Sequence, residues 1–282
     1  MDGNVNLKDN ERIDDLERNG YRIIQNSRRF CFGMDAVLLS GFVWEGESGR
    51  AWANRGEDRE DGLPAGRDTT DLKIADLGTG TGIIPLLLHG RLGNPGPGCS
   101  RKEGGGPKII GLEIQEEMQD MAQRSVCLNG LESEICMIRG DLREAAQILG
   151  RGTFDVVTSN PPYMKAGGGL TNPGSSKAIS RHEILCTLED VVSQAAALLK
   201  SGGRFYLVHR PERLAEILET LRRFRLEPKR LRMVHSFADS EAAMVLIESA
   251  KGGNPFLKVE RPLVIYQEKN KYTSEVLELY YY

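Results

Sequence analysis

The sequence predicts an α/β fold built on a doubly wound, mostly parallel sheet. Short apolar runs rich in β-branched residues alternate along the chain with stretches of helical periodicity. One run, 73–77, leads through Gly78-Thr79-Gly80-Thr81-Gly82 into an apolar helical stretch at 83–89. Another run, 154–159, leads directly into Asn160-Pro161-Pro162-Tyr163. Ligands of open α/β sheets bind at the carboxyl ends of strands, so both motifs are expected at a binding edge.

Composition limits the class of protein. With 282 residues and 40% apolar content, the chain has room for one large domain or two small ones and for a sizeable core. No stretch approaches the roughly 20 apolar residues that span a bilayer, and the polar start of the chain lacks a signal core. Five cysteines without a C-x-x-C pair and four scattered histidines predict neither disulfides nor a metal site. We therefore expect a cytoplasmic protein, and a monomer is favoured.

The glycine run predicts a tight turn against a ligand. Glycines at alternate positions let the backbone approach a bound molecule closely, and the following helix N-terminus faces that molecule. A glycine-rich turn between a strand and a helix is a weak signal by itself, because it binds a dinucleotide in some proteins and nothing in others.

Acidic residues follow two further predicted strands. The run 109–113 ends at Glu113, and the run 135–138 leads into Gly140-Asp141. A carboxylate at the end of the second strand of a nucleotide-binding unit can accept hydrogen bonds from both ribose hydroxyls. One such acid is more often a cap or a turn residue. Two at successive strand ends, after the glycine run and before Asn160, indicate one spaced binding site.

The Asn-Pro-Pro-Tyr motif predicts a site for a flat amine. The Asn160 side chain and the Pro161 carbonyl can both accept hydrogen bonds from one planar NH2 group, and Tyr163 offers a ring for stacking. An isolated Asn-Pro-Pro equally well marks the end of a strand. The upstream motifs favour the functional interpretation.

These motifs resemble the class I S-adenosylmethionine-dependent methyltransferases that carry Asn-Pro-Pro-Tyr. The segment 30–39, Phe-Cys-Phe-Gly-Met-Asp-Ala-Val-Leu-Leu, is similar to one in the bacterial tRNA(Val) adenine N6-methyltransferases, and the resemblance runs from about Gln25 to Tyr266. It implies a Rossmann-like, seven-stranded, mostly parallel sheet with one antiparallel strand near the C-terminus. It also implies methylation of the adenine just 3′ of the anticodon of a tRNA.

The motifs, the local positive charge and the resemblance together give each candidate residue an expected role. The catalytic group is Asn160, Pro161 and Tyr163. The target base and RNA are expected at Pro162, Tyr163, Lys165, Arg28 and Arg29. For Asp76, a role in holding the glycine loop stays open beside a water-mediated contact to the methionine amine. The residues expected at the cofactor are Asp35, Asp76, Gly78, Thr79, Gly80 and Gly82 around its methionine part, Glu113 at its ribose, Asp141 at its adenine, and Asn160.

Three rival functions remain open. A protein glutamine N5-methyltransferase acting on release factors shares Asn-Pro-Pro-Tyr, because an amide NH2 poses the same geometric problem. An rRNA guanine N2-methyltransferase is possible, although such enzymes favour Phe at the position of Tyr163. An inactive nucleotide-binding or RNA-binding module is the non-enzymatic alternative, and the presence of Asn160 and of the glycine loop argues against it.

Charge and composition suggest how the chain is organised. The net charge is −3, yet residues 200–235 hold ten basic and four acidic side chains, which makes this segment a candidate phosphate-binding face. The alternative is a solvated helix and strand with pairs such as Glu219 and Arg223. Residues 1–24 are expected to form an N-terminal arm and 25–282 a single methyltransferase domain. Insertions are expected at about 45–70 and 90–107, and the loop 164–180 is expected to close over the target.

Overall fold

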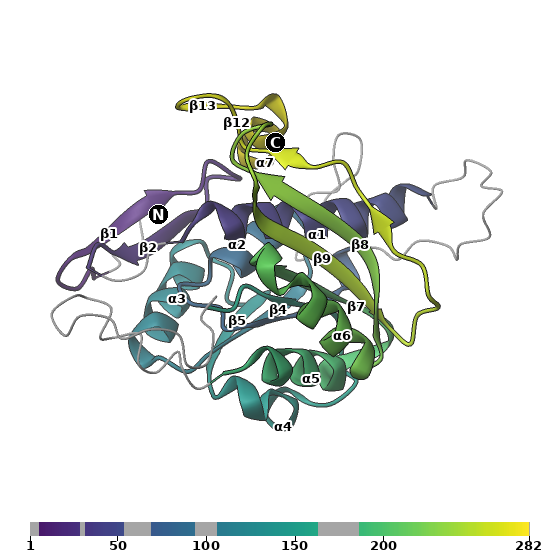
Figure 1. Ribbon diagram of the computed structural model, residues 1–282. Helices are drawn as coiled ribbons and strands as arrows, with labels where there is room; N and C mark the ends of the chain where they lie inside the picture. The colour runs from purple at the N-terminus through teal and green to yellow at the C-terminus, as the bar shows by residue number, and fades with distance from the viewer. Residues whose placement is uncertain (1–5, 29–31, 54–68, 94–105, 163–185, 282) are drawn as a thin grey trace, which may run out of the picture.

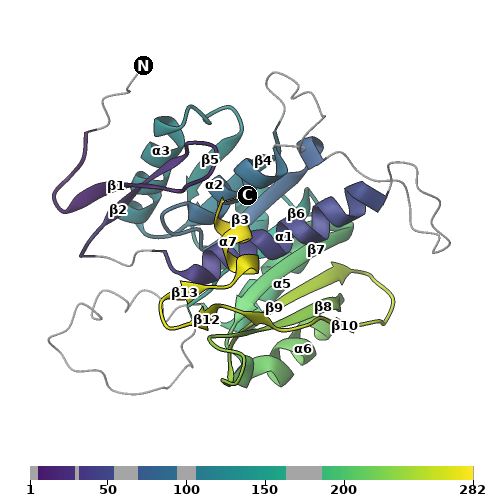
Figure 2. The same cartoon turned by 90° about the horizontal axis from the view of Figure 1, so that it is seen from above.

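A central sheet carries helices on both faces (Figure 1, and Figure 2 from above). The computed structural model describes residues 6–28, 32–53, 69–93, 106–162 and 186–281. One face is covered by α1 (Met34–Ala53), α2 (Ile83–Leu92), α3 (Glu116–Leu128) and α7 (Ser274–Tyr281). The other face is covered by α4 (Ala145–Leu149), α5 (Leu188–Leu198) and α6 (Leu214–Arg223). Short 3-10 turns lie at Thr69–Asp71, Leu142–Glu144 and Pro211–Arg213.

The sheet confirms the predicted topology. Its order is β10-β8-β9-β7-β6-β3-β4-β5, and β11 also pairs with β8. Neighbours from β5 to β7 are parallel, whereas β9 runs antiparallel to both β7 and β8. The two-residue strands β10 and β11 extend the edge beyond the seven expected strands. The strands are β3 (Lys73–Leu77), β4 (Lys108–Glu113), β5 (Ile135–Arg139), β6 (Phe154–Ser159), β7 (Leu199–His209), β8 (Leu226–His235), β9 (Ala242–Lys251), β10 (Lys258–Val259) and β11 (Leu263–Val264).

The central strands are buried on both faces, which explains their continuous apolar sequences. In β3, Ile74 packs into the core under α1 and α2, while Ala75 packs into the core under α5. Val156 and Val157 of β6 divide in the same way. Because successive side chains of a strand point to opposite faces, a helix layer is required on each side of the sheet.

The N-terminal segment is an ordered hairpin, where the sequence predicts a loose arm. Strands β1 (Glu11–Asp15) and β2 (Arg22–Asn26) pair antiparallel, and the segment between them buries Leu16. The sequence alone did not indicate paired strands here, because most side chains of β1 are charged and only β2 buries most of its residues. A second small hairpin, β12 (Tyr266–Glu268) with β13 (Lys271–Tyr272), precedes α7.

Helix α1 occupies the first part of the expected insertion at 45–70. It runs to Ala53, and the remainder of that insertion, 54–68, lies outside the described residues. Glu45 and Glu47 have partners on the sheet: Arg232 and Arg230 for Glu45, and the Tyr206 hydroxyl for Glu47. The charged residues at 45–53 suggested a solvated insertion because the partners of Glu45 and Glu47 lie more than 150 residues further along the chain. Of the second insertion, 94–105 also lies outside the described residues.

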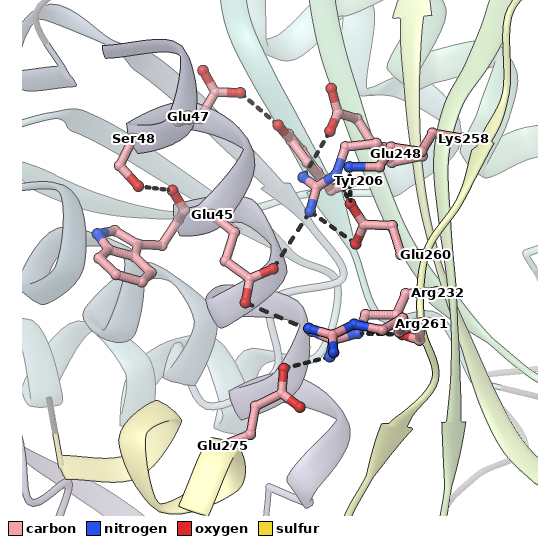
Figure 3. Close-up of polar contacts among 12 residues, drawn as sticks. Glu45, Glu47, Ser48, Tyr206, Arg232, Glu248, Lys258, Glu260, Arg261 and Glu275 are labelled. Atoms are coloured by element: carbon pink, nitrogen blue, oxygen red, sulfur yellow. Dashed lines mark hydrogen bonds and ion pairs between the residues drawn. The ribbon is translucent and has the colours of Figure 1, made fainter. Parts of the chain in front are cut away.

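A network of arginines and carboxylates joins α1 to β8 and β9 (Figure 3). Arg230 contacts Glu260 at 2.8 Å, Glu248 at 3.0 Å and Glu45 at 3.4 Å, and its guanidinium lies 4.3 Å from the centre of the Phe42 ring. Burial raises the pKa of Glu45, and the nearby arginines oppose that effect. The carboxylates of this network therefore depend on the guanidinium groups between them.

Arg230→Met should expose that dependence. Removing one partner of a buried ion pair leaves charges uncompensated, so we expect a loss of about 3 kcal/mol or more in the free energy of unfolding, measured by urea denaturation at pH 7.5. The matched control is Arg223→Met, which breaks the exposed pair with Glu189 and should cost at most about 1 kcal/mol. Equal losses for the two variants would contradict the central role of Arg230.

Candidate active site

A cavity of about 350 Å³ opens at the carboxyl edge of β3, β4, β5 and β6. The structure brings together nine of the predicted site residues in its lining: Asp35, Gly78, Thr79, Gly80, Glu113, Asp141, Asn160, Pro161 and Pro162. Asp76 and Gly82 belong to the same strand and loop but are not among the lining residues. Arg28 is exposed and does not line the cavity. Arg29, Tyr163 and Lys165 lie outside the described residues.

The glycine loop needs its glycines for backbone reasons. Gly78, Gly80 and Gly82 have φ of +73°, +57° and +82°, a region that L side chains rarely adopt. The Gly78 and Thr79 amides donate to the Leu112 carbonyl at 2.9 and 3.1 Å, which holds the loop on β4. Helix α2 begins directly afterwards, so its N-terminus faces the cavity.

Glu113 ties two walls of the cavity together. It ends β4, is 5% exposed, and accepts hydrogen bonds from the Gly80 amide at 3.0 Å and the Gln115 amide at 2.9 Å. Each carboxylate oxygen can accept more than one hydrogen bond, so both can still receive a ligand hydroxyl.

Asp141 follows β5 at the far side of Glu113. It accepts hydrogen bonds from the Arg143 amide at 2.9 Å and from the Arg143 side chain. These hydrogen bonds hold the pKa of Asp141 below its ordinary value. The carboxylate therefore stays ionised and can accept a hydrogen bond from an amino group in the cavity.

Asp76 lies beneath the glycine loop. One of its oxygens accepts the Thr158 hydroxyl at 2.7 Å, and burial raises its pKa to about 6 against the opposing effect of that hydrogen bond. Its Oδ2 atom and the Thr79 hydroxyl are both buried, and Thr79 lies close enough to oppose the rise in the pKa of Asp76 without a hydrogen bond of good geometry. Two buried polar atoms of this kind beside a cavity suit a polar ligand or a bridging water.

Asn160 and Pro161 lie beside the glycine loop because β6 pairs with β3. The Ser159 hydroxyl donates to the Leu77 carbonyl at 2.9 Å, so the two strand ends are joined directly before their loops diverge. Pro161 is buried and Pro162 is exposed. The motif thus extends from the cavity wall toward the surface.

Sequence reasoning missed several lining residues. Ile114, Met118 and Leu142 supply an apolar slot between Glu113 and Asp141, and Ile114 is 41% exposed there. Sequence reasoning also missed Gly111, which does not line the cavity but packs under the glycine loop. A Cβ at this position would lie within 3 Å of the Thr79 and Met137 side chains. A glycine inside a predicted strand signals such a close approach. The apolar residues of the slot carried no signal that distinguished them from core residues.

The basic segment 200–235 is not a free cationic face. Five of its side chains, such as Lys200 on Asp155 and Arg223 on Glu189, pair with carboxylates outside the segment. Arg223 thus pairs with Glu189 and not with Glu219 as expected. The local excess of positive charge came from counting only acids near in sequence. The six external carboxylates are Glu45, Asp155, Glu189, Glu248, Glu260 and Glu275.

Comparison with known proteins agrees with this geometry. No family model matches the chain. A relative from Porphyromonas gingivalis, named tRNA1(Val) (adenine(37)-N6)-methyltransferase, is 27% identical over 254 residues, which cover 88% of this chain and 86% of the relative. A relative of the same name from Aeromonas salmonicida is 26% identical over 247 residues, covering 88% and 87%.

Solved structures show the same fold. A predicted O-methyltransferase from Agrobacterium tumefaciens superposes with a TM-score of 0.59 at 23% identity, covering 87% of this chain and 95% of that one. A putative class I S-adenosylmethionine-dependent methyltransferase from Listeria monocytogenes gives 0.54 at 12% identity, covering 84% and 67%. The protein has the fold of S-adenosylmethionine-dependent methyltransferases.

S-adenosylmethionine is the cofactor that this cavity fits. Three groups of lining residues follow one another along the ends of β3, β4 and β5. They are the glycine loop with the N-terminus of α2, the Glu113 carboxylate, and Asp141 with the apolar side chains beside it. Backbone amides at a helix N-terminus, a buried carboxylate and a second carboxylate beside apolar side chains therefore lie along one edge of the sheet. Neighbouring strands are about 4.8 Å apart, so the series spans about 10 Å.

Neither a metal cluster nor a membrane span is found in the described ranges. No group of three or more His, Cys, Asp or Glu side chains there is placed to hold a metal ion. None of the helices among the same residues is long and apolar enough to cross a bilayer.

Asp76→Asn should reveal the buried carboxylate through the pH dependence of stability. The pKa of Asp76 is about 6 in the folded chain and near 3.9 in an unfolded one, so its contribution to stability is present at low pH and lost as pH rises through 6. We expect the free energy of unfolding of the wild type, relative to Asp76→Asn, to fall by about 1 kcal/mol between pH 5 and pH 8. Urea denaturation at both pH values measures it.

The control for this measurement is Asp141→Asn. The pKa of Asp141 is lowered, so its contribution to stability changes only as pH falls below its ordinary value, outside this window. If the difference in free energy of unfolding between the wild type and Asp76→Asn did not change with pH, the pKa of Asp76 would not be raised in the folded chain.

Proposed function

We propose that this protein transfers a methyl group from S-adenosylmethionine to the exocyclic N6 of an adenine in tRNA, at the position next to the anticodon on its 3′ side. The observation that carries the proposal is that one cavity holds both the cofactor elements and the Asn160-Pro161 acceptors. The names of the relatives, matched over 86% and 87% of their lengths, support the choice of tRNA adenine. Such a substrate would place the protein in the cytoplasm.

In this proposal the ends of three strands would hold the cofactor. The glycine loop, with Asp35 and Asp76, would hold the methionine part, Glu113 would bind the ribose hydroxyls and Asp141 would accept from the adenine amine. When bound, S-adenosylmethionine supplies an electrophilic methyl group on a sulfonium. The apolar side chains of Ile114, Met118 and Leu142 in the lining would favour contact with a flat purine over contact with water.

The target amine is activated by hydrogen bonding. An aromatic NH2 is a weak nucleophile because its lone pair is delocalised into the ring. Two acceptors, the Asn160 side-chain oxygen and the Pro161 carbonyl, draw the amine protons into a more tetrahedral arrangement that directs the lone pair at the methyl group. The nitrogen forms its bond to carbon, sulfur keeps the electrons of the broken bond, and one amine proton leaves to solvent. No general base is required.

The RNA-facing part of the proposal rests on residues that the sequence predicts for this role. Tyr163 stacks on the base, and Pro162, Lys165, Arg28 and Arg29 contact the base or its backbone. An adenine must leave its stack to reach the cavity, and that costs least in a single-stranded loop. An anticodon loop meets this requirement.

The proposal is tested by methyl transfer from labelled S-adenosylmethionine to unmodified total tRNA, with purified release factor in a parallel reaction, followed by nucleoside and amino-acid analysis. We expect label in N6-methyladenosine, and a rate at least about 100-fold lower for Asn160→Ala. Asn254→Ala, an exposed asparagine that contributes only its backbone carbonyl to Lys229, is the control and should match the wild type. Label on glutamine would reject the proposed substrate in favour of the release-factor rival, and label on guanine N2 of the tRNA would reject adenine as the target base.

A further inference from the structure

Gln25 is a buried polar residue near the end of β2 and is not among the residues that line the cavity. It is 2% exposed. Its side-chain nitrogen donates to Asp14 Oδ2 at 2.9 Å, across the hairpin, and its side-chain oxygen accepts the Phe32 amide at 3.1 Å. The residue thus joins the first strand of the hairpin to the segment that leads into α1.

The orientation of this amide is determined by its partners. A backbone N–H can only donate, so the Gln25 oxygen must face Phe32, and an ionised carboxylate can only accept, so the nitrogen must face Asp14. Asp14 is held in turn by Arg12, whose Nε lies 2.8 and 3.1 Å from the two carboxylate oxygens. We call the pair of hydrogen bonds from the Gln25 side chain to Asp14 and Phe32 the Gln25 bridge. Each end has a fixed donor and acceptor, so a substitution that turns a donor into an acceptor leaves two like groups facing each other.

The Phe32 end of the bridge is a wall of the cavity. Phe32, Gly33 and Asp35 all line it. Gly33 packs tightly there, because a Cβ would come within 2.7 Å of Asp35 Oδ1. Asp35 also accepts the Ala36 amide at 3.0 Å. Only Gly33 and Met34 separate Phe32 from Asp35, so a shift of the Phe32 backbone would be passed on to the Asp35 carboxylate.

The other edge of β2 is fastened to the opposite wall. The Ile24 amide donates to the Ser125 hydroxyl at 2.9 Å, and Asn129 exchanges two hydrogen bonds with the backbone of Arg22 at 2.8 and 2.7 Å. Both partners lie on or at the end of α3, whose first turns carry Met118 in the cavity lining. The hairpin thus connects α3, on one side of the cavity, to the segment that leads into α1, on the other side.

We propose that Gln25 is a positioning residue for cofactor binding: through the Phe32 amide it holds the Phe32–Asp35 wall at the distance from α3 that the cofactor requires. This inference rests on the proposed function, since it assumes that the cavity takes S-adenosylmethionine. It adds a part of the chain that lies outside every cofactor motif, and it gives the N-terminal hairpin a role in affinity.

Substitutions that exchange hydrogen-bond donors and acceptors can break the contact between Gln25 and Asp14 and then restore it. Gln25→Glu keeps the acceptor for Phe32 but places a second carboxylate against Asp14. The double variant Asp14→Asn with Gln25→Glu restores a donor between the two side chains. Asp14→Asn alone keeps an acceptor for Gln25 and loses only the exposed pair with Arg12, so it is the matched control.

Affinity for S-adenosylhomocysteine, measured by calorimetry, is the first readout. We expect Kd to rise about ten-fold in Gln25→Glu and to return to within about three-fold of the wild type in the double variant, while Asp14→Asn stays near the wild type. In methyl-transfer assays, KM for S-adenosylmethionine should rise about ten-fold while KM for tRNA and kcat stay unchanged. A purely structural role would lower the fraction of molecules that bind and leave Kd and KM as they were.

Equal Kd values for the wild type and Gln25→Glu, or a double variant as weak as Gln25→Glu, would overturn this inference and leave the proposed function standing. A wild-type protein that binds no S-adenosylhomocysteine would overturn the proposed function and this inference with it.

Discussion

The candidate site depends on one constraint, the parallel register of β3, β4, β5 and β6. Because these strands run in the same direction, their carboxyl ends meet at one edge, and the loops that follow them must share a single opening. Side chains reinforce the register there: the Ser159 hydroxyl bonds to Leu77, and the Thr158 hydroxyl bonds to Asp76. The glycine loop, Glu113, Asp141 and Asn160 are separated by up to 82 positions along the chain, and the sheet brings them into one lining.

Helix α1 connects this edge to the rest of the molecule. Its first turn carries Asp35 into the cavity, and Glu45 and Glu47 further along it join Arg230, Arg232 and Tyr206 on the sheet. The same helix therefore serves as a cavity wall at one end and as an ion-paired strut at the other. Glu45 and Glu47 of α1 each bind specific partners on the sheet, and these contacts fix the position of the helix on the sheet.

The cavity also unites two kinds of electrostatic environment. Asp76 is fully enclosed, and burial raises its pKa, whereas Asp141 lies against Arg143, which lowers its pKa. The Asp141 carboxylate thus remains charged over the physiological range, while burial raises the pKa of Asp76 to about 6. Binding of a positively charged amino group would favour the ionised form of Asp76.

The sequence by itself determined the elements that are written locally. The strands at 73–77 and 154–159 were predicted with the bounds that the structure has, because an apolar run ended by glycine or proline needs no distant partner to be recognised. Tertiary structure alone decided the rest. It turned the charged N-terminus into a hairpin through contacts with α3, neutralised the basic segment 200–235 with six distant carboxylates, and placed Gln25 between Asp14 and Phe32. The physical reason is the same in each case: the free energy of a charged or polar side chain depends on what surrounds it in space, and neighbours along the chain do not reveal that.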